Sequence, residues 1–391
     1  MYRYSVFFLG IVLVMMLLSS CIERYYPEEE DLQPGTLVVA AHLNSVPGVQ
    51  SLQISRSVTL TNTGYTPVSG CYVELERADG LTREFPETEQ GEYSCDLDQD
   101  FLQTSMEYRL NFISGEGKQY QSEFELMHPA PEIDSLRFQK EVWRTENVRV
   151  SNEGIRFYVD FEIEKDSGRY LRWDLEETYE LINPDYPTRM YGTNRRWSSL
   201  LYGDKILHCW ITRHVPGIYT KDMELVGGAI YYKMPLSYVS GSETRRLYEK
   251  YSLLVTQLSL SEQAFWYWSE LSKNTQSGSE LFSSQPALTA SNICNVDDGS
   301  EIVIGYFSMA GASQKRIFVV DPPEVDIFFD PYICAPGVFP KFLWNYPQDK
   351  LPLYVARANI RGVAENGKVK DECVFCNLYK GSSDQKPDFW E

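Results

Sequence analysis

Short runs of alternating apolar and polar residues constrain this chain more than any other feature of its sequence. In one run Leu52, Ile54 and Val58 fall on the same face of an extended strand, and a period of two is typical of a half-buried β-strand. Turn formers such as Pro47-Gly48 separate the runs. About seven such strands fit between residues 36 and 128. This density predicts an immunoglobulin-like or transthyretin-like β-sandwich over 36–128.

A proline-rich stretch follows this region. Residues 129–134 read Pro-Ala-Pro-Glu-Ile-Asp, which predicts an extended linker. Beyond it, residues 135–391 are again rich in β-type residues, while the Ser-capped segment Ser261–Lys273 has apolar residues at helical spacing. Leu200–Ile206 fits either a strand or a short helix. Further candidate strands are Ile155–Ile163, Arg169–Leu181, Leu225–Met234, Tyr248–Leu258, Glu301–Ser308 and Lys315–Val320.

These patterns together predict an all-β chain. We expect the N-terminal sandwich to be followed by a larger, mainly-β C-terminal domain over 135–391, with one or two short helices. A length of 391 residues fits this division, because domains usually hold about 100–200 residues.

The first twenty residues have the features of an export signal. Arg3 precedes an almost wholly apolar run that ends at Ser20, which predicts a secretory signal peptide over 1–20. A transmembrane anchor is the alternative, since about 20 apolar residues can span a bilayer. The run ends in Leu18-Ser-Ser-Cys21, which is similar to a bacterial lipobox. We therefore expect cleavage before Cys21 and lipidation of its thiol, which would anchor the chain on a membrane.

An acidic stretch follows Cys21. Residues 28–31 are four consecutive acids, so we expect residues 21–35 to form a solvated tether. The stretch resembles the surface-export signal of Bacteroidota lipoproteins. That resemblance implies a protein of the outer membrane that faces the extracellular side.

The charge and histidine content limit the possible partners. The chain has 55 Asp and Glu against 36 Lys and Arg, a net charge of −19. Such a chain cannot neutralise a run of phosphates, so nucleic acid is not expected as a partner. Four histidines leave little material for a histidine-based metal or proton-transfer centre. We predict no metal, no cofactor and no catalytic residue.

The cysteines predict disulfides. There are eight, and an exported protein forms disulfides in its oxidising compartment. Lipidation of Cys21 leaves seven, so at least one stays unpaired. Cys71 and Cys95 fall on neighbouring predicted strands, and we expect them to pair.

The pair Cys373 and Cys376 is compatible with half a zinc site, a redox pair or structural disulfides. No second Cys-x-x-Cys accompanies it, and a zinc site needs four ligands. Structural disulfides are favoured, with partners among Cys209, Cys294 and Cys334.

Three polar patterns have a functional and an ordinary interpretation. A cluster of carboxylates, of which Glu324 and Asp326 would share one strand face, suits glycoside hydrolysis, but acids are common throughout this chain and a solvated face is favoured. A polar turn suits calcium, but it lacks the full loop of a calcium hand. Two nearby histidines lack a nucleophilic serine motif. The residues concerned are Asp321, Glu324, Asp326 and Asp330 for the acids, Asn295–Glu301 for the turn, and His208 and His214.

Aromatic residues give the one candidate ligand site. The chain has 8 Trp, 27 Tyr and 19 Phe, most of which we expect to fill β-sheet cores. Tyr191, Trp197 and Tyr202 lie instead in a polar stretch. These three are the best candidates for exposed rings that could stack on sugars or peptides.

Several segments resemble the Bacteroidota lipoprotein family catalogued as domain of unknown function 4249. They span the mature chain in order: Leu37-Val-Val, Ile54-Ser-Arg56-Ser, Val68-Ser-Gly70, Pro131-Glu-Ile-Asp134, Ala264-Phe-Trp-Tyr-Trp268, Leu281-Phe282, Ser291-Asn-Ile293, Gly305-Tyr-Phe307, Cys373-Val-Phe-Cys376 and Lys386-Pro-Asp-Phe-Trp390. The segment after Cys376 lacks the Arg and double Gly of the family pattern, which affects the expected loop geometry there.

The resemblance implies a surface lipoprotein that works with TonB-dependent outer-membrane receptors, and it implies no known reaction. We expect a non-enzymatic protein that docks on such a barrel as an accessory subunit, for ligand capture or complex assembly. The alternatives are an exported hydrolase of glycans or peptides, and an adhesin-like structural module.

Overall fold

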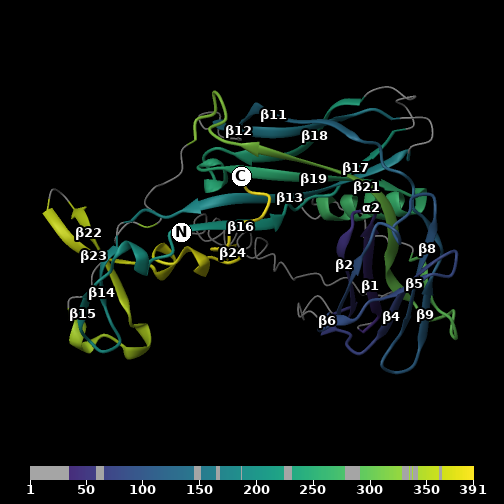
Figure 1. The fold of residues 1–391 in the computed structure, drawn as a ribbon, viewed down its shortest axis with the longest axis horizontal. Coiled ribbons are helices and arrows are strands. Elements are labelled where there is room, and N and C mark those ends of the chain that lie inside the picture. Colours follow the sequence, from purple (N-terminus) through teal and green to yellow (C-terminus); the bar gives the residue numbers. More distant parts are fainter. Residues whose placement is uncertain are drawn as a thin grey trace, which may run out of the picture.

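The computed structural model describes residues 35–58, 66–144, 151–163, 168–185, 187–223, 231–277, 291–327, 334, 337, 342–360 and 363–391. These residues form β-sheets almost throughout, and the one α-helix among them is α2 (Glu262–Ser277). Figure 1 shows an arch, with a sandwich at one end, a second sandwich across the top and a small sheet at the other end. The predicted all-β fold is confirmed.

The first sandwich packs two sheets face to face. Alternate residues point inward, such as Ile54 and Tyr93 from one sheet and Val73 and Leu110 from the other, and all four are buried in one core. One sheet contains β1 (Leu37–Asn44), β2 (Gly48–Arg56), β3 (Thr66–Pro67), β6 (Glu87–Glu89) and β7 (Glu92–Leu97). The other contains β4 (Tyr72–Arg77), β5 (Thr82–Glu84), β8 (Glu107–Ile113), β9 (Gln119–Ser122), β10 (Glu125–Leu126) and β20 (Ile293–Asn295).

A single long strand, β21 (Val303–Val319), belongs to both sandwiches. Its first half pairs in parallel with β1, and its second half pairs antiparallel with β19 (Tyr251–Leu260). One 11-stranded sheet therefore runs through both sandwiches. The sequence predicted two strands here, both in the C-terminal domain. Instead, residues 293–309 complete the first core, because pairing between distant segments is not visible in local periodicity.

The second sandwich has a core rich in aromatic residues. Phe157 and Phe161 face Trp173 and Tyr251 across it, and all four are buried. The larger sheet adds β13 (Tyr170–Ile182), β16 (His208–His214), β17 (Tyr219–Asp222) and β24 (Ser382–Ser383) to β19 and β21. The facing sheet contains β11 (Ile133–Arg144), β12 (Ser151–Phe161) and β18 (Tyr231–Ser240).

The stretch expected to be a linker is fixed between the sandwiches. The carbonyl oxygen of Pro131 accepts hydrogen bonds from Gln257 Nε2 at 2.7 Å and Ser313 Oγ at 2.8 Å. Strand β11 begins two residues later. Residues 129–134 therefore hold the sandwiches together more tightly than a free spacer would.

Helix α2 covers the outer face of the larger sheet. Ser261 caps it, because its Oγ accepts a hydrogen bond from the backbone N–H of Ala264 at 3.1 Å. Ala264 and Trp268 pack with Tyr306 in a separate apolar cluster. The helix expected over Ser261–Lys273 is confirmed. Among the described residues no helix has the length and apolar character needed to cross a membrane.

A small four-stranded sheet, which we call the arm, forms the other end of the arch (Figure 1). It contains β14 (Pro187–Tyr191), β15 (Trp197–Ser199), β22 (Leu353–Ile360) and β23 (Val363–Val369). Short 3₁₀ turns connect the elements: η1 (Tyr202–Asp204), η3 (Arg245–Leu247), η5 (Leu343–Asn345), η6 (Gln348–Lys350), η7 (Asp371–Cys373) and η8 (Cys376–Leu378). The segment Leu200–Ile206 thus contains a short helical turn rather than a strand.

Two disulfides fasten the C-terminal segment. Cys209 on β16 is bonded to Cys376 in η8, and Cys334 to Cys373 in η7. The expectation that Cys373 and Cys376 form structural disulfides is confirmed, with partners from the expected set.

The expected pairing of Cys71 with Cys95 is wrong. Both thiols are free. Cys71 precedes β4 in one sheet, whereas Cys95 lies on β7 of the facing sheet. Cys294 is also free, and it is exposed. Cys21 lies outside the described residues, so its lipidation stays a prediction.

Candidate functional site

A hollow of about 500 Å³ lies where the two sandwiches meet. We call it the junction hollow. Its walls come from the turn between β1 and β2, from the loop 99–104 and from the middle of β21. The lining residues are Ser45, Val46, Pro47, Gln99, Leu102, Gln103, Thr104, Ala312 and Gln314. None of them is charged, so the hollow offers amides, hydroxyls and small apolar groups.

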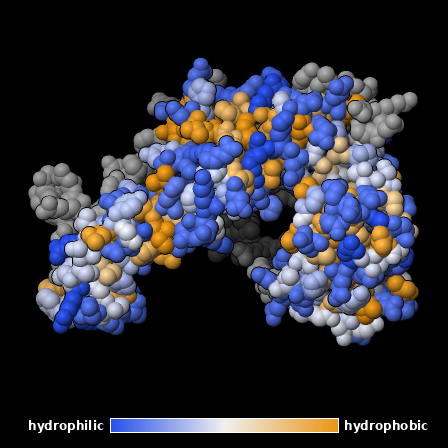
Figure 2. All heavy atoms as spheres, in the orientation of Figure 1, coloured by the Kyte–Doolittle hydropathy of each residue, from blue (hydrophilic) through white to orange (hydrophobic). Residues whose placement is uncertain are grey.

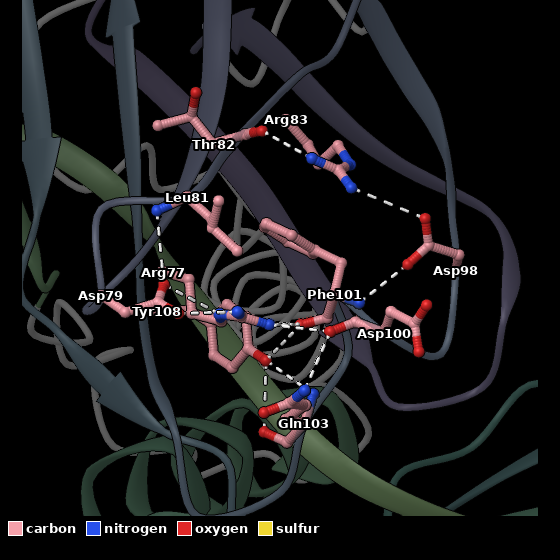
Figure 3. Close-up of polar contacts among 10 residues, drawn as sticks. All are labelled: Arg77, Asp79, Leu81, Thr82, Arg83, Asp98, Asp100, Phe101, Gln103 and Tyr108. Atoms are coloured by element: carbon pink, nitrogen blue, oxygen red, sulfur yellow. Dashed lines mark hydrogen bonds and ion pairs between the residues drawn. The ribbon is translucent and has the colours of Figure 1, made fainter.

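The loop wall is fixed from beneath by a buried arginine. Arg77 on β4 is only 5% exposed, and its guanidinium donates hydrogen bonds to the carbonyl oxygens of Asp100 at 2.8 Å and Phe101 at 3.0 Å. Asp79 pairs with the same guanidinium at 2.7 Å, and this contact lowers the pKa of the Asp79 carboxyl. Figure 3 shows these groups converging under the loop.

A tyrosine fixes the same loop from the start of β8. Tyr108 Oη donates to the carbonyl oxygen of Phe101 at 2.7 Å and accepts from the backbone N–H of Gln103 at 2.8 Å (Figure 3). Burial raises the pKa of this phenol. The arrangement resembles the tyrosine corner of immunoglobulin-type sandwiches. The Asp98 carboxylate also accepts from the N–H of Phe101 at 2.8 Å. The loop is therefore ordered before anything binds.

The other walls are also tied down. Ser45 Oγ accepts from the backbone N–H of Ala312 at 2.8 Å, which joins the β1–β2 turn to β21. Gln314 Nε2 donates to Thr256 Oγ1 at 2.9 Å. A preformed, uncharged hollow of this kind has no titratable group for acid–base chemistry, but it matches the neutral peptide groups of a partner loop.

A second, smaller hollow lies on the arm and has a volume of about 260 Å³. Of the three aromatic residues expected to form a platform, Trp197 is 38% exposed and lines this hollow, and Tyr191 is buried. Their ring centroids lie 5.2 Å apart. Tyr202 is 73% exposed but lies in η1 and does not line the hollow. The expectation of exposure is thus wrong for Tyr191, because this last residue of β14 is buried with its ring packed against that of Trp197.

The structure adds lining residues that the sequence did not single out. The hollow is completed by Met190, Gly192, Thr193, Asn194, Arg196, Ser198 and Pro352. The polar run between Tyr191 and Trp197 was the available signal, because such a run between two short strands is typical of a hairpin loop. Pro352 comes from a distant segment and left no local signal.

The acids considered for hydrolysis do not form a site among the described residues. Glu324 and Asp326 line neither hollow. The backbone of Glu324 accepts a hydrogen bond from Lys140 Nζ at 2.5 Å, and the N–H of Asp326 contacts the Glu153 carboxylate at 3.4 Å. Asp321 precedes them in the same connection, and Asp330 lies outside the described residues. Their arrangement is that of an irregular surface connection.

The turn considered for calcium is held by protein groups alone. The Glu301 carboxylate accepts from Asn295 Nδ2 at 2.6 Å, Lys118 Nζ at 2.9 Å and Tyr120 Oη at 3.0 Å. These donors engage both carboxylate oxygens of Glu301, which is one of the possible ligands in the turn. Across the described ranges, no three His, Cys, Asp or Glu residues are placed to share a metal ion.

The two histidines lie on one strand, β16. His208 packs its ring on Trp210 with centroids 4.3 Å apart, and its Nε2 lies 3.5 Å from a carboxylate oxygen of Glu180. His214 is exposed at the end of the strand. Neither histidine lines a hollow.

The second sandwich contains a buried ion-pair network that the sequence did not predict. Glu177 is 1% exposed, and its carboxylate contacts Arg213 at 2.7 Å, Arg246 at 3.0 Å and Tyr251 Oη at 2.9 Å. With its oxygens engaged in this way, Glu177 is a structural group of the second sandwich.

A second buried carboxyl lies under helix α2. Glu125 is 6% exposed, and burial raises its pKa. Its Oε1 accepts from Tyr306 Oη and from Asn292 Nδ2. Glu125 lines neither hollow, so we assign it to packing of the interior.

The fold defines this chain as an all-β protein of two joined sandwiches that carries a small disulfide-braced arm. Comparison with known protein families shows to which family the chain belongs. The chain belongs to the family described as "Domain of unknown function (DUF4249)", which matches residues 22–316. The membership predicted from the sequence motifs is therefore confirmed.

Comparisons with individual proteins add little. No curated protein matches the chain. Among solved structures, it is similar to the crystal structure of trypsin-activated alpha-2-macroglobulin from Escherichia coli at 9% identity and a TM-score of 0.18. That match covers 59% of this chain and only 15% of the other. A likeness at this score carries no argument about fold or function.

Proposed function

We propose that this protein is a lipid-anchored outer-membrane protein that docks at the cell surface on a TonB-dependent barrel. It would act there as an accessory subunit for ligand capture or complex assembly. The Leu-Ser-Ser-Cys sequence that ends at Cys21 and the acids at 28–31 support the anchor and the location. The family match begins at residue 22, so it does not overlap the expected leader.

The junction hollow is the observation that carries the docking proposal. It is preformed, it is uncharged, and its walls are fixed by Arg77, Tyr108 and Ser45. Interfaces bind well when their surface is ordered in advance, because ordering side chains and loops on binding costs free energy. Neutral amides and hydroxyls at the rim suit the backbone groups of a barrel's extracellular loop.

The tether keeps the hollow near the membrane. About 15 residues separate Cys21 from the start of β1, and a chain of that length extends at most about 50 Å. Strand β1 leads directly into the turn Ser45–Pro47 that lines the hollow. Confinement to the membrane plane raises the effective concentration of the hollow near any barrel.

Co-purification from native membranes in mild detergent tests this proposal. We expect the protein to be recovered with a TonB-dependent barrel. Thr104→Arg places a cation in the uncharged hollow and should abolish recovery of the barrel. Thr82→Arg is the matched control, because Thr82 is exposed on β5 of the same sandwich and does not line the hollow. Recovery of the native protein alone, or an undiminished barrel yield with Thr104→Arg, would refute docking through this hollow.

A further inference from the structure

The arm and the neighbouring turns η1, η5 and η6 hold more basic than acidic residues, whereas the whole chain is acidic. Residues 187–205, 342–360 and 363–370 contain eight Lys and Arg against three Asp and Glu, whereas the whole chain has 36 against 55. Figure 2 shows the visible face of the arm as mostly pale, near the middle of the hydropathy scale, with scattered hydrophilic and hydrophobic residues. A basic module on an acidic protein attracts anions to that module.

The hollow on the arm has the size of a site for a small polar group. Its volume of about 260 Å³ is below that of pockets that hold drug-sized molecules. The indole of Trp197 forms one wall, while Asn194 and Ser198 supply neutral hydrogen-bonding groups. This combination of one aromatic face and several polar groups suits a single sugar ring.

Three arginines near the hollow have different roles. The Arg189 guanidinium lies 4.6 Å from the ring centroid of Trp197 and packs on the indole. Arg195 donates to the carbonyl oxygen of Trp344 at 2.7 Å and so fastens the loop to η5. Arg196 is one of the residues that line the hollow, and its guanidinium makes no ion pair or hydrogen bond with any part of the chain that the structure describes. Arg196 is thus the cation available to a ligand.

The loop that carries Arg196 is ordered by its own hydrogen bonds. The backbone N–H of Arg196 donates to Asn194 Oδ1 at 3.0 Å, and the carbonyl oxygen of Arg196 accepts from the N–H of Gly192 at 3.0 Å. From the distant segment, Gln348 Nε2 donates to the carbonyl oxygen of Thr193 at 2.7 Å. A ligand would therefore meet a loop that is already in place, which favours binding.

We propose that the hollow on the arm binds a sugar ring that carries an anionic substituent, with the ring on Trp197 and the anion paired with Arg196. A guanidinium matches the planar oxygens of carboxylates and phosphates in two parallel hydrogen bonds. Such a sugar has two possible sources: a soluble acidic saccharide, or the phosphorylated sugar headgroup of a membrane lipid. This inference does not rest on lipidation of Cys21 or on docking to a barrel.

Calorimetric titration of the full-length protein in detergent tests the ligand class. The probes are glucuronate, glucose 6-phosphate and, as the neutral comparison, glucose. We expect the two acidic sugars to bind at least about tenfold more tightly than glucose, and their affinity to fall as salt is added. Titration with a phosphorylated glucosamine lipid in the micelle distinguishes the sources: tighter binding of the lipid assigns the headgroup, and tighter binding of the free sugars assigns a soluble saccharide.

Variants test the site itself. Arg196→Gln should weaken binding of both acidic sugars about tenfold or more and leave glucose unchanged, while Trp197→Leu should weaken all three. Lys350→Gln is the matched control, because it removes one positive charge from η6 of the same arm, outside the hollow. It should change affinity by less than about twofold, since exposed charges act weakly at a distance.

Three results would overturn the inference. They are equal losses in Arg196→Gln and Lys350→Gln, equal affinity of the wild type for glucose and glucuronate, and no binding of any probe at millimolar concentration. The circular dichroism spectrum and melting temperature of each variant are measured first. If Arg196→Gln fails to fold, Arg196→Lys replaces it. That variant keeps the charge but loses the paired geometry, so it should weaken binding of the acidic sugars by a smaller factor; unchanged affinity would count against the assigned contact.

Discussion

Arg77 and Tyr108 donate hydrogen bonds to the same backbone oxygen, that of Phe101, at 3.0 and 2.7 Å. The two side chains come from neighbouring strands, β4 and β8, whose residues 77 and 108 are paired directly. One strand pair therefore fixes the loop that forms a wall of the junction hollow. The stability of the sandwich and the shape of the hollow depend on the same contacts.

These contacts predict an order of effects for two substitutions. Arg77→Met leaves two buried carbonyl groups without their charged donor and should cost about 3 kcal/mol of unfolding free energy. Tyr108→Phe removes one neutral hydroxyl and should cost about 1–2 kcal/mol. Urea unfolding followed by tyrosine and tryptophan fluorescence measures both. A larger loss for Tyr108→Phe would contradict the central role assigned to Arg77.

The local sequence pattern was sufficient to predict many of the strands and the helix. The alternation of Leu52 and Ile54 and the Ser261 cap correspond to β2 and α2, because both signals arise within a few residues. The partners of β21 did not follow from such signals, since Val39 and Gly305 pair across 266 residues of chain. The same limit applies to Cys71 and Cys95, whose sequence proximity gave no information on which sheet holds each strand.

Glu125 predicts a pH dependence of stability. Burial raises the pKa of this carboxyl in the folded state, so its protonated form fits the interior better than its charged form. The stabilisation is complete below the unfolded-state pKa of about 4.3 and is lost as the pH rises through the higher folded-state pKa. Glu125→Gln, which mimics the protonated form, should therefore match the wild type at pH 4 and exceed it in unfolding free energy at pH 8.

Glu89 is the matched control for that measurement. It is exposed on β6 of the facing sheet and is not among the groups that shift the Glu125 pKa, so Glu89→Gln should leave the pH profile of the wild type unchanged. Unfolding free energies are compared at pH 4, 6 and 8 for all three proteins. A Glu125→Gln profile parallel to that of the wild type would show that the buried carboxyl does not titrate in this range.

The free thiols predict a pattern of alkylation. Cys294 is exposed, whereas Cys71 and Cys95 are partly buried, and burial raises the pKa of both of their thiols. Without reductant at pH 8, Cys294 should react with iodoacetamide about tenfold faster than the other two, because the thiolate is the reactive form. Peptide mass spectrometry after timed quenching measures the rates. A Cys71–Cys95 linked peptide would contradict the structure.

The candidate sites were less accessible to sequence reasoning than the fold was. Trp197 was identified because an aromatic residue in a polar run is unusual, but Arg196 beside it looked like an ordinary surface charge. Only the structure distinguishes the two arginines, because Arg195 is engaged with η5, a contact between segments about 150 residues apart. The sequence contains no signal for the junction hollow. Uncharged residues such as Thr104 and Ala312 line a hollow only because the fold brings their distant segments together where the sandwiches meet.

Lipidation of Cys21 gives the most direct test of the proposed location. The mature N-terminal peptide should begin at Cys21 and carry acyl chains, since their burial in the bilayer provides the anchor. Mass spectrometry of the purified native protein measures this. Cys21→Ala should abolish both the modification and the partition into detergent, whereas Cys294→Ala should leave both intact. A native chain that still begins at Met1 would contradict the proposal.

A substitution at Gly305 tests whether the pairing of β1 with β21 joins the two sandwiches. The φ of Gly305 is +103°, and a Cβ there would lie 1.9 Å from the carbonyl oxygen of Val39, its partner on β1. Gly305→Ala must therefore either strain the backbone or separate β1 from β21, and we expect it to cost about 3 kcal/mol or more. Gly299→Ala is the control, because a Cβ at Gly299 meets no atom within 4 Å, and its effect should stay within about 0.5 kcal/mol.

The strands in which Gly305→Ala raises amide exchange are as informative as the loss of unfolding free energy. Since β21 lies in both sandwiches, loss of the β1–β21 pairing should also raise amide exchange in the second sandwich, along β19, which pairs with the other half of β21. Hydrogen-exchange mass spectrometry of Gly305→Ala measures this spread. Exchange that rises in β1 and β2 but not in β19 would mean that the two sandwiches unfold independently, despite the strand that they share.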